Sequence, residues 1–374
     1  NSFEYYLSIL PIHFILCILR RHVHHSFSGP PLIIPLQTIW NCPTVIINKN
    51  QGGIFVEYET FLNEVKEQME HALGKGYDLT LRRVPKNNGL MLDGLCIAKS
   101  GGHVAPAIYL NPCYLQHQAG RPIGDIVSEL MTLYQDNQTP PDVDYEKLAC
   151  FEEIRPFIAC RLIHADSNQA LLKEIPHIAW LDLALVFYLC LHEDDSGLMT
   201  ATIHNLHLDI WNISLTELKE TALANTPRLF PPVISSMARI IEDLSEAMEQ
   251  EPASQPFGNQ PGDHGLPDPD ASAPFFVLSN TSGINGAACI LYPGVLKNFA
   301  DSMEKDIIIL PSSIHEVLLL PDDGDISYNE MSRLVAHINQ TEVPKEDRLS
   351  NQVYFYSRQN QSLTLASSSA IPIC

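Results

Sequence analysis

The chain has 374 residues, of which 45% are apolar, so it can bury a core in one large domain or two modest ones. Its 23 basic and 44 acidic side chains give a formal net charge of −21, and the basic residues form no cluster. Binding to nucleic acid or to an anionic membrane surface requires clustered cations, so the composition argues against both kinds of partner.

The first 55 residues differ in character from the rest of the chain. An apolar run at 5–19 precedes its basic residues, whereas a signal peptide carries them first, and the run is short for a membrane span. The Gln-Gly-Gly sequence at 51–53 can be encoded by a ribosome-binding sequence, and Val56 by a GTG start codon. We therefore expect an untranslated or disordered segment here, with a membrane-associated extension as the alternative.

From Val56 to residue 248 the spacing of apolar residues predicts a mixed α and β domain. The expected helices lie at 57–73, 122–135, 214–224 and 233–248, and the expected strands at 77–84, 90–98, 105–110, 158–163 and 175–191. A turn composition at 85–89 predicts that the first two strands form a hairpin. Ser214 and Glu217 have the spacing of a capping box at the start of a helix.

A Pro-rich, acidic segment at 249–273 predicts a linker or long exposed loop before a second module at 274–357. The module has expected strands at 275–278, 306–310, 315–320 and 352–356, and expected helices at 285–303, with a kink at Pro293-Gly294, and from Ser327 to 338. This β-α-β-β-α-β order is that of ferredoxin-like domains. We therefore expect an α+β protein with a ferredoxin-like C-terminal module and a disordered tail at 358–374.

Five groups of segments carry a family resemblance. They are Asn87-Asn88-Gly89 with Leu92-Asp93-Gly94, 105–110, Asn285-Gly286-Ala287-Ala288, 310–317 and 353–356. Together they resemble an uncharacterised bacterial family catalogued as domain of unknown function 5688, over roughly residues 56 to 356. Since that family has no established activity, the resemblance implies no catalytic residue.

The segment at 311–316 holds the strongest candidate site. Ser312, Ser313, His315 and Glu316 offer hydroxyls, an imidazole and a carboxylate within one turn of chain. A nucleophile needs a base within hydrogen-bond reach, and on a hairpin Ser313 and His315 could face the same side. No Gly-x-Ser-x-Gly elbow surrounds either serine, and a turn in which a serine bonds the local backbone is the alternative.

A second candidate is the loop at 280–286, expected between a strand and a helix. Backbone amides around Asn285 and Gly286 could hold a phosphate or carboxylate, but the loop lacks both the Walker lysine and the full Gly-x-Gly-x-x-Gly pattern. A simple turn is the alternative. This loop and the 311–316 turn could form one site, but a ferredoxin-like module would more naturally place them at opposite edges of the sheet.

Metal binding is not expected from the remaining polar clusters. His204 and His207 lie in a segment, 200–210, whose composition favours a strand, which would point them to opposite faces. The Asp-rich turn at 322–325 has its glycine too early for a calcium-binding EF-hand loop. The nine cysteines include no C-x-x-C pair, and their odd number fits a reducing cytoplasm.

These patterns favour a soluble, cytoplasmic binding or regulatory protein whose C-terminal module engages an unknown protein or small-molecule partner. The alternative is a hydrolase that uses the Ser312-Ser313-His315-Glu316 segment. We expect no cofactor, no metal and no nucleic-acid partner, and a membrane partner only if residues 5–19 are expressed.

Overall fold

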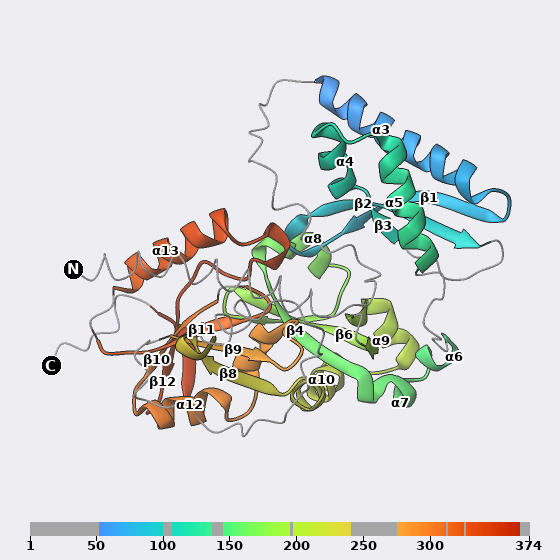
Figure 1. The fold of residues 1–374 in the computed structure, drawn as a ribbon. Helices are drawn as coiled ribbons and strands as arrows, with labels where there is room; N and C mark the ends of the chain where they lie inside the picture. Colours follow the sequence, from blue (N-terminus) through green and yellow to red (C-terminus); the bar gives the residue numbers. More distant parts are fainter. Residues whose placement is uncertain are drawn as a thin grey trace, which may run out of the picture.

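The computed structural model describes residues 52–99, 107–136, 145–194, 197–240, 275–311, 313–324 and 327–366. Helices and three antiparallel sheets make an α+β fold, as the sequence predicts (Figure 1). The expectation for residues 1–51 lies outside the described residues, but 52–55 already belong to the first described helix. Among the described residues, no helix is both long enough and apolar enough to cross a membrane.

Residues 52–136 form a unit with its own core at one end of the molecule (Figure 1). Its elements are α3 (Gly52–Leu73), β1 (Tyr77–Pro85), η2 (Asn87–Gly89), β2 (Met91–Lys99), β3 (Ala107–Tyr109), α4 (Asn111–Gln118) and α5 (Ile123–Asp136). The strands form a sheet in the order β1-β2-β3. The apolar stripe of α3, including Phe61, Val65 and Met69, packs with Leu95 and Ile97 of β2, so both predicted helices and the predicted hairpin are confirmed here.

The second sheet is built around β6, which pairs with the other three strands. Its strands are β4 (Ile158–His164), β5 (His177–Trp180), β6 (Leu183–Asp194) and β7 (Gly197–Thr202). Short helices precede or connect them: α6 (Tyr145–Leu148), α7 (Phe151–Ile154), η3 (Arg155–Phe157), η4 (Asp166–Asn168) and α8 (Gln169–Leu172). The helix α10 (Leu215–Leu229) follows; its Ser214 cap accepts a hydrogen bond from the Glu217 amide at 3.1 Å, which confirms the predicted start of this helix and its N-cap.

The strand expected at 200–210 is wrong beyond Thr202, because α9 (Asn205–Trp211) occupies most of it. Leu208 and Trp211, three residues apart, both pack on the main core, and this spacing fits one face of a helix. Asn212 has φ 53° and ends the helix in the left-handed conformation.

The third sheet has six strands in the order β13-β12-β10-β11-β9-β8. They are β8 (Pro232–Ser236), β9 (Phe276–Asn280), β10 (Ile307–Leu310), β11 (Val317–Pro321), β12 (Tyr354–Ser357) and β13 (Ser362–Leu365). The helices between them are η5 (Gly286–Leu291), α12 (Val295–Met303), α13 (Tyr328–Thr341) and η6 (Lys345–Asp347). Ser327 caps α13 as predicted, and the helix expected at 285–303 is broken near Pro293-Gly294.

The ferredoxin-like module is not confirmed, because its two long helices cover opposite faces of this sheet. Phe299 of α12 packs in the cluster that contains Ile307 and Ile309, whereas Val335 of α13 packs with Ile308 on the other face. In α+β domains such as the expected module the helices gather on one face. The reason lies in β10, which is buried on both faces and therefore needs cover on each side.

Two edge strands also differ from the expectation. β8 occupies 232–236, where the start of a helix at 233–248 was predicted, and residues 241–248 lie outside the described part of the chain. β13 lies within the expected tail at 358–374, and its side chains are mostly exposed. Backbone hydrogen bonds hold both strands in the sheet: β8 pairs with β9, and β13 pairs with β12. The apolar pattern of an edge strand does not predict such pairing.

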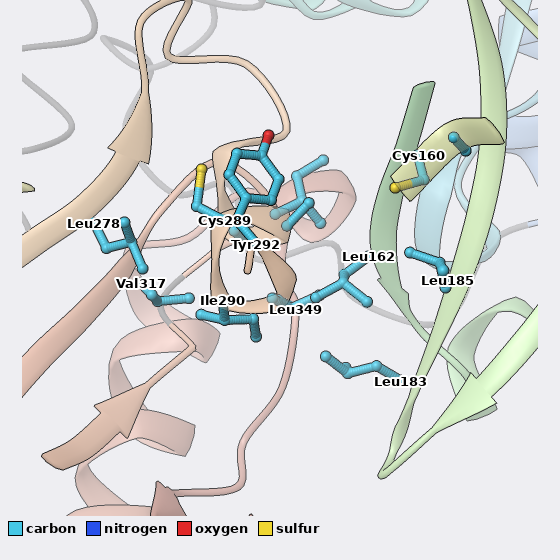
Figure 2. Packing of buried hydrophobic residues seen from close by; sticks show 14 of the residues in the cluster. Cys160, Leu162, Leu183, Leu185, Leu278, Cys289, Ile290, Tyr292, Val317 and Leu349 are labelled. Carbon is cyan, nitrogen blue, oxygen red and sulfur yellow. The ribbon is translucent and has the colours of Figure 1, made fainter. Parts of the chain in front are cut away.

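One large core joins the second and third sheets. Figure 2 shows Leu162 and Leu185 of the second sheet facing Ile290 and Tyr292, which follow β9 along the chain. The buried clusters thus group the described residues as 52–136 and 145–366, and the segment 249–273 connects the neighbouring strands β8 and β9.

Candidate functional site

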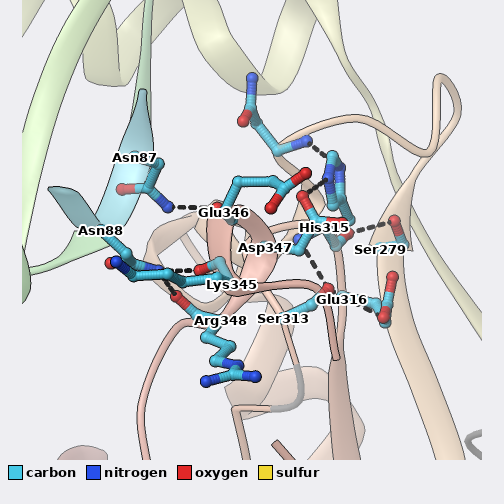
Figure 3. A network of polar contacts seen from close by, with 11 residues as sticks. Asn87, Asn88, Ser279, Ser313, His315, Glu316, Lys345, Glu346, Asp347 and Arg348 are labelled. Atoms are coloured by element: carbon cyan, nitrogen blue, oxygen red, sulfur yellow. Dashed lines mark hydrogen bonds and ion pairs between the residues drawn. The ribbon is translucent and has the colours of Figure 1, made fainter. Parts of the chain in front are cut away.

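The two segments singled out in the sequence, 280–286 and 311–316, meet in the structure. Ser279 Oγ donates a hydrogen bond to the His315 carbonyl oxygen at 2.8 Å (Figure 3), and the Asn285 amide donates to His315 Nδ1 at 3.3 Å. The expectation that they lie at opposite edges of the sheet is wrong. Because β11 runs between β9 and β10, its first residue, Val317, pairs with Leu278 near the end of β9.

The turn itself is closed by Ser313. This side chain is fully buried; its Oγ donates to Glu316 Oε1 at 2.9 Å and accepts from the His315 amide at 3.0 Å. Glu316 is only 6% exposed, so this hydrogen bond satisfies one of its buried oxygens. The hydroxyl therefore bonds the local chain, as in the turn interpretation, while Ser312 lies outside the described residues.

His315 links three segments through its ring. Nδ1 accepts from the Asn285 amide, and Nε2 lies 3.1 Å from Asp347 Oδ1. A neutral ring with its proton on Nε2 satisfies both contacts, because the backbone amide can only donate. The imidazole nitrogens thus contact a backbone amide and a carboxylate, and Ser313 Oγ accepts a hydrogen bond from the His315 backbone amide.

The tip of the β1–β2 hairpin fastens the first unit to the same region. Asn88 Nδ2 donates to the carbonyl oxygens of Lys345 and Arg348, each at 2.7 Å, and Asn87 Nδ2 donates to the Glu346 carbonyl at 2.6 Å (Figure 3). Asn88 and Asn168 also exchange two hydrogen bonds, of 2.8 and 3.0 Å. We call the contacts of Asn87 and Asn88 with Asn168 and residues 345–348 the hairpin latch. The sequence predicts this segment only as a turn.

Glu346, whose carbonyl oxygen belongs to the hairpin latch, should limit stability at neutral pH. Burial raises the pKa of its carboxyl, so the charged form is disfavoured in the folded protein. Glu346→Gln is therefore expected to raise the free energy of unfolding at pH 7 by about 0.5–1 kcal/mol, with no effect below about pH 4, where the carboxyl is protonated in both states. Urea unfolding of both proteins at pH 7 and pH 4 measures this; an equal gain at the two pH values would contradict it.

Arg161 is a functional candidate that the sequence interpretation missed. It lies on β4, on the face opposite the main core, since its neighbours Cys160 and Leu162 both point into that core. Its Nε is enclosed and has no hydrogen-bond partner within the described part of the chain, although part of the residue remains accessible. Burial lowers the pKa of the guanidinium, which faces the ring of Tyr188; the ring centre lies 5.8 Å from Cζ.

That contact does not compensate for burial. A cation–π contact contributes about 0.5–2 kcal/mol, whereas removing an ion from water costs several kcal/mol. The other described arginines have charged or backbone partners or are exposed to water. Carboxylates pair with four of the described arginines, Arg83, Arg121, Arg155 and Arg358. Four more are exposed, Arg82, Arg228, Arg239 and Arg333, and Arg348 donates to the carbonyl oxygens of Val343 and Gln340. A charged residue in the middle of the apolar run 158–163 is the sequence signal that could have identified Arg161.

Polar groups gather beside this guanidinium. Tyr188 pairs with Ala159 across β4 and β6, so its side chain lies on the same sheet face as Arg161. Burial raises the pKa of the Tyr188 phenol, and a hydrogen bond with the Asn285 side chain opposes that rise. Asn285 is held at φ 55°, and its own amide is bonded to His315. We call Arg161, Tyr188 and Asn285 the Arg161 site.

The remaining candidates have structural roles. His204 and His207 form a capping box at the start of α9; the His204 amide donates to His207 Nδ1 at 2.9 Å, and burial with the nearby His204 ring lowers the pKa of His207. Asp322 accepts hydrogen bonds from the Gly324 amide and the Tyr328 hydroxyl. Over the described ranges, no three His, Cys, Asp or Glu residues are grouped so that they could hold a metal ion.

Comparison with known proteins gives one match. The model of a family described as "Family of unknown function (DUF5688)" matches residues 58–358. No curated protein and no solved structure matches the chain.

Proposed function

Because the chain belongs to DUF5688, a family of unknown function, its role has to be inferred from its own geometry, and we propose that it is a cytoplasmic binding or regulatory protein. The observation that supports binding over hydrolysis is the arrangement around His315. Its Nδ1 accepts from the Asn285 amide and its Nε2 contacts Asp347, so the ring fixes three segments in place. Both ring contacts join separate segments of the chain, which is the role expected of a histidine that holds a binding surface in shape.

Ser313 supports the same proposal. Its hydroxyl is fully buried and hydrogen-bonded to Glu316, which leaves no approach for a substrate to Oγ. The 311–316 turn then serves to position Asn285, whose side chain opposes the rise of the Tyr188 pKa at the Arg161 site. In this proposal the C-terminal sheet contributes to binding through its loops, and the ligand contacts both sheets of the larger unit.

Labelling with a fluorophosphonate probe tests the proposal against the hydrolase alternative. We expect no labelling of the purified protein above that of a heat-denatured sample, because the Ser313 hydroxyl is buried and hydrogen-bonded to Glu316. Ser312→Ala and Ser313→Ala serve as controls, since Ser312 lies outside the described residues. Stoichiometric labelling of the wild type that disappears in either variant would overturn the binding proposal in favour of the hydrolase.

A further inference from the structure

We propose that the Arg161 site binds a small oxyanion, the carboxylate or phosphate group of a small-molecule ligand. This inference rests on the proposed binding function and names the ligand chemistry. A guanidinium carries five N–H donors in a planar fork that matches the two oxygens of a carboxylate or phosphate.

The first argument is the missing counter-charge. The chain has 44 acidic side chains and only 23 basic ones, yet Arg161 has no carboxylate partner among the described residues. Acidic residues pair with Arg83, Arg121 and Arg358, which are more accessible to water. An arginine with an enclosed Nε and no anion is a site prepared for an anion from outside the chain.

The second argument is the presence of two hydrogen-bond donors at the Arg161 site. The Tyr188 hydroxyl and the Asn285 amide group can each donate a hydrogen bond to an oxyanion, and neither carries a competing negative charge. Asn285 is buried and held by the loop that packs against His315, so it is fixed before a ligand arrives. Such prior fixing lowers the entropic cost of binding.

The third argument is the surroundings on the same sheet face. Two small apolar clusters flank Arg161. One contains Ile163, Ile175, Ala184 and Val186, and the other Ala159, Tyr188 and Phe230. An isolated cation between apolar clusters suits a ligand that joins an anionic group to an apolar body, because most small-molecule sites combine apolar lining with a few placed polar groups.

Thermal unfolding in buffers of equal ionic strength tests the proposal. The probes are sodium phosphate and sodium acetate at 1–50 mM, against sodium chloride as the reference. We expect phosphate, acetate or both to raise the wild-type Tm by about 2–5 °C in a saturable manner, because a ligand that binds only the folded state stabilises it. A larger shift with phosphate assigns a phosphate-bearing ligand, and a larger shift with acetate assigns a carboxylate-bearing one.

Arg161→Met and Arg333→Met are the matched variants, since Arg333 is an exposed arginine on α13. We expect Arg161→Met to lose at least two thirds of the shift and to melt no lower than the wild type in chloride, because it removes a buried charge without removing a pairing. Arg333→Met should keep the full shift. Equal shifts in all three proteins would reveal a general salt effect and overturn the proposal.

Arg161→Lys guards against misfolding of the methionine variant. It keeps the positive charge but loses the fork, so we expect a reduced shift with an unchanged Tm in chloride. A wild type that fails to respond to either probe also overturns the oxyanion site. If fluorophosphonate labelling is negative in that case, the binding function stands without it, whereas positive labelling removes the binding function itself.

Discussion

Gly286→Ala is expected to lower the free energy of unfolding by about 3 kcal/mol or more, the largest loss expected for alanine at any glycine in the described part of the chain. A Cβ at this position would lie 2.9 Å from the Asn280 amide nitrogen and closer still to Ser279 Oγ and the His315 carbonyl oxygen. Two of these three atoms are backbone, so they cannot rotate away. The loop and the turn would have to separate, which breaks the Ser279–His315 hydrogen bond. Guanidinium unfolding followed by circular dichroism measures the loss.

Gly124→Ala is the matched control for this substitution. Gly124 lies in the first turn of α5, and nothing stands within 4 Å of the Cβ that alanine would add. Alanine is the better helix former, so this variant should be up to about 1 kcal/mol more stable than the wild type. If Gly286→Ala unfolds at the same denaturant concentration as Gly124→Ala, the close packing of the 280–286 loop on the 311–316 turn is wrong.

Asn88→Ala is expected to cost about 3 kcal/mol and to release the first unit from the larger one. The substitution removes the donors to the Lys345 and Arg348 carbonyls and the acceptor for Asn168 Nδ2. Buried polar groups left without partners cost about 1–3 kcal/mol each, and solvent entering the loosened latch recovers part of that. Hydrogen exchange measures the release: amides of 86–91 and 345–348 should exchange at least tenfold faster, while those of β10 stay protected.

Two further variants separate the loss of the Asn88 hydrogen bonds from the backbone strain that alanine introduces. Asn88 has φ 57°, a conformation that alanine adopts with strain and glycine without it. Asn88→Gly should therefore lose the hydrogen bonds alone and recover about 1 kcal/mol relative to Asn88→Ala. Asn298→Ala, at an exposed position on α12, should change stability by less than about 0.5 kcal/mol. Unchanged exchange in Asn88→Ala would show that the hairpin latch does not hold the two units together.

Some of the fold could be predicted because its causes are local. The helices that begin at Ser214 and Ser327 are set by a side chain that caps an amide three residues away. The stripe on α3 and the hairpin around 85–89 are likewise encoded within about twenty residues. The sequence of β10 also bears on the fold, because its four consecutive apolar residues place apolar side chains on both faces of the sheet. Both faces then have to be covered by other elements, which argues against a ferredoxin-like module.

The candidate site was predicted only in part, because its contacts join distant parts of the chain. Sequence reasoning selected Asn285, Gly286, Ser313, His315 and Glu316, but it could not tell that 280–286 and 311–316 meet beside Asp347. The two segments meet because β11 pairs with both β9 and β10. This strand order results from pairing between distant parts of the chain, which the local sequence pattern does not specify.

The sequence by itself determined the α+β class, most of the helices and strands, and the family resemblance, because these follow from apolar period and short-range hydrogen bonding. The tertiary structure alone decided the cover on both faces of the third sheet, the edge strands β8 and β13, the hairpin latch and the isolation of Arg161. The physical reason is that pairing, burial and counter-charge are properties of neighbours in space. Neighbours such as Asn88 and Arg348, 260 positions apart, are brought together only by folding.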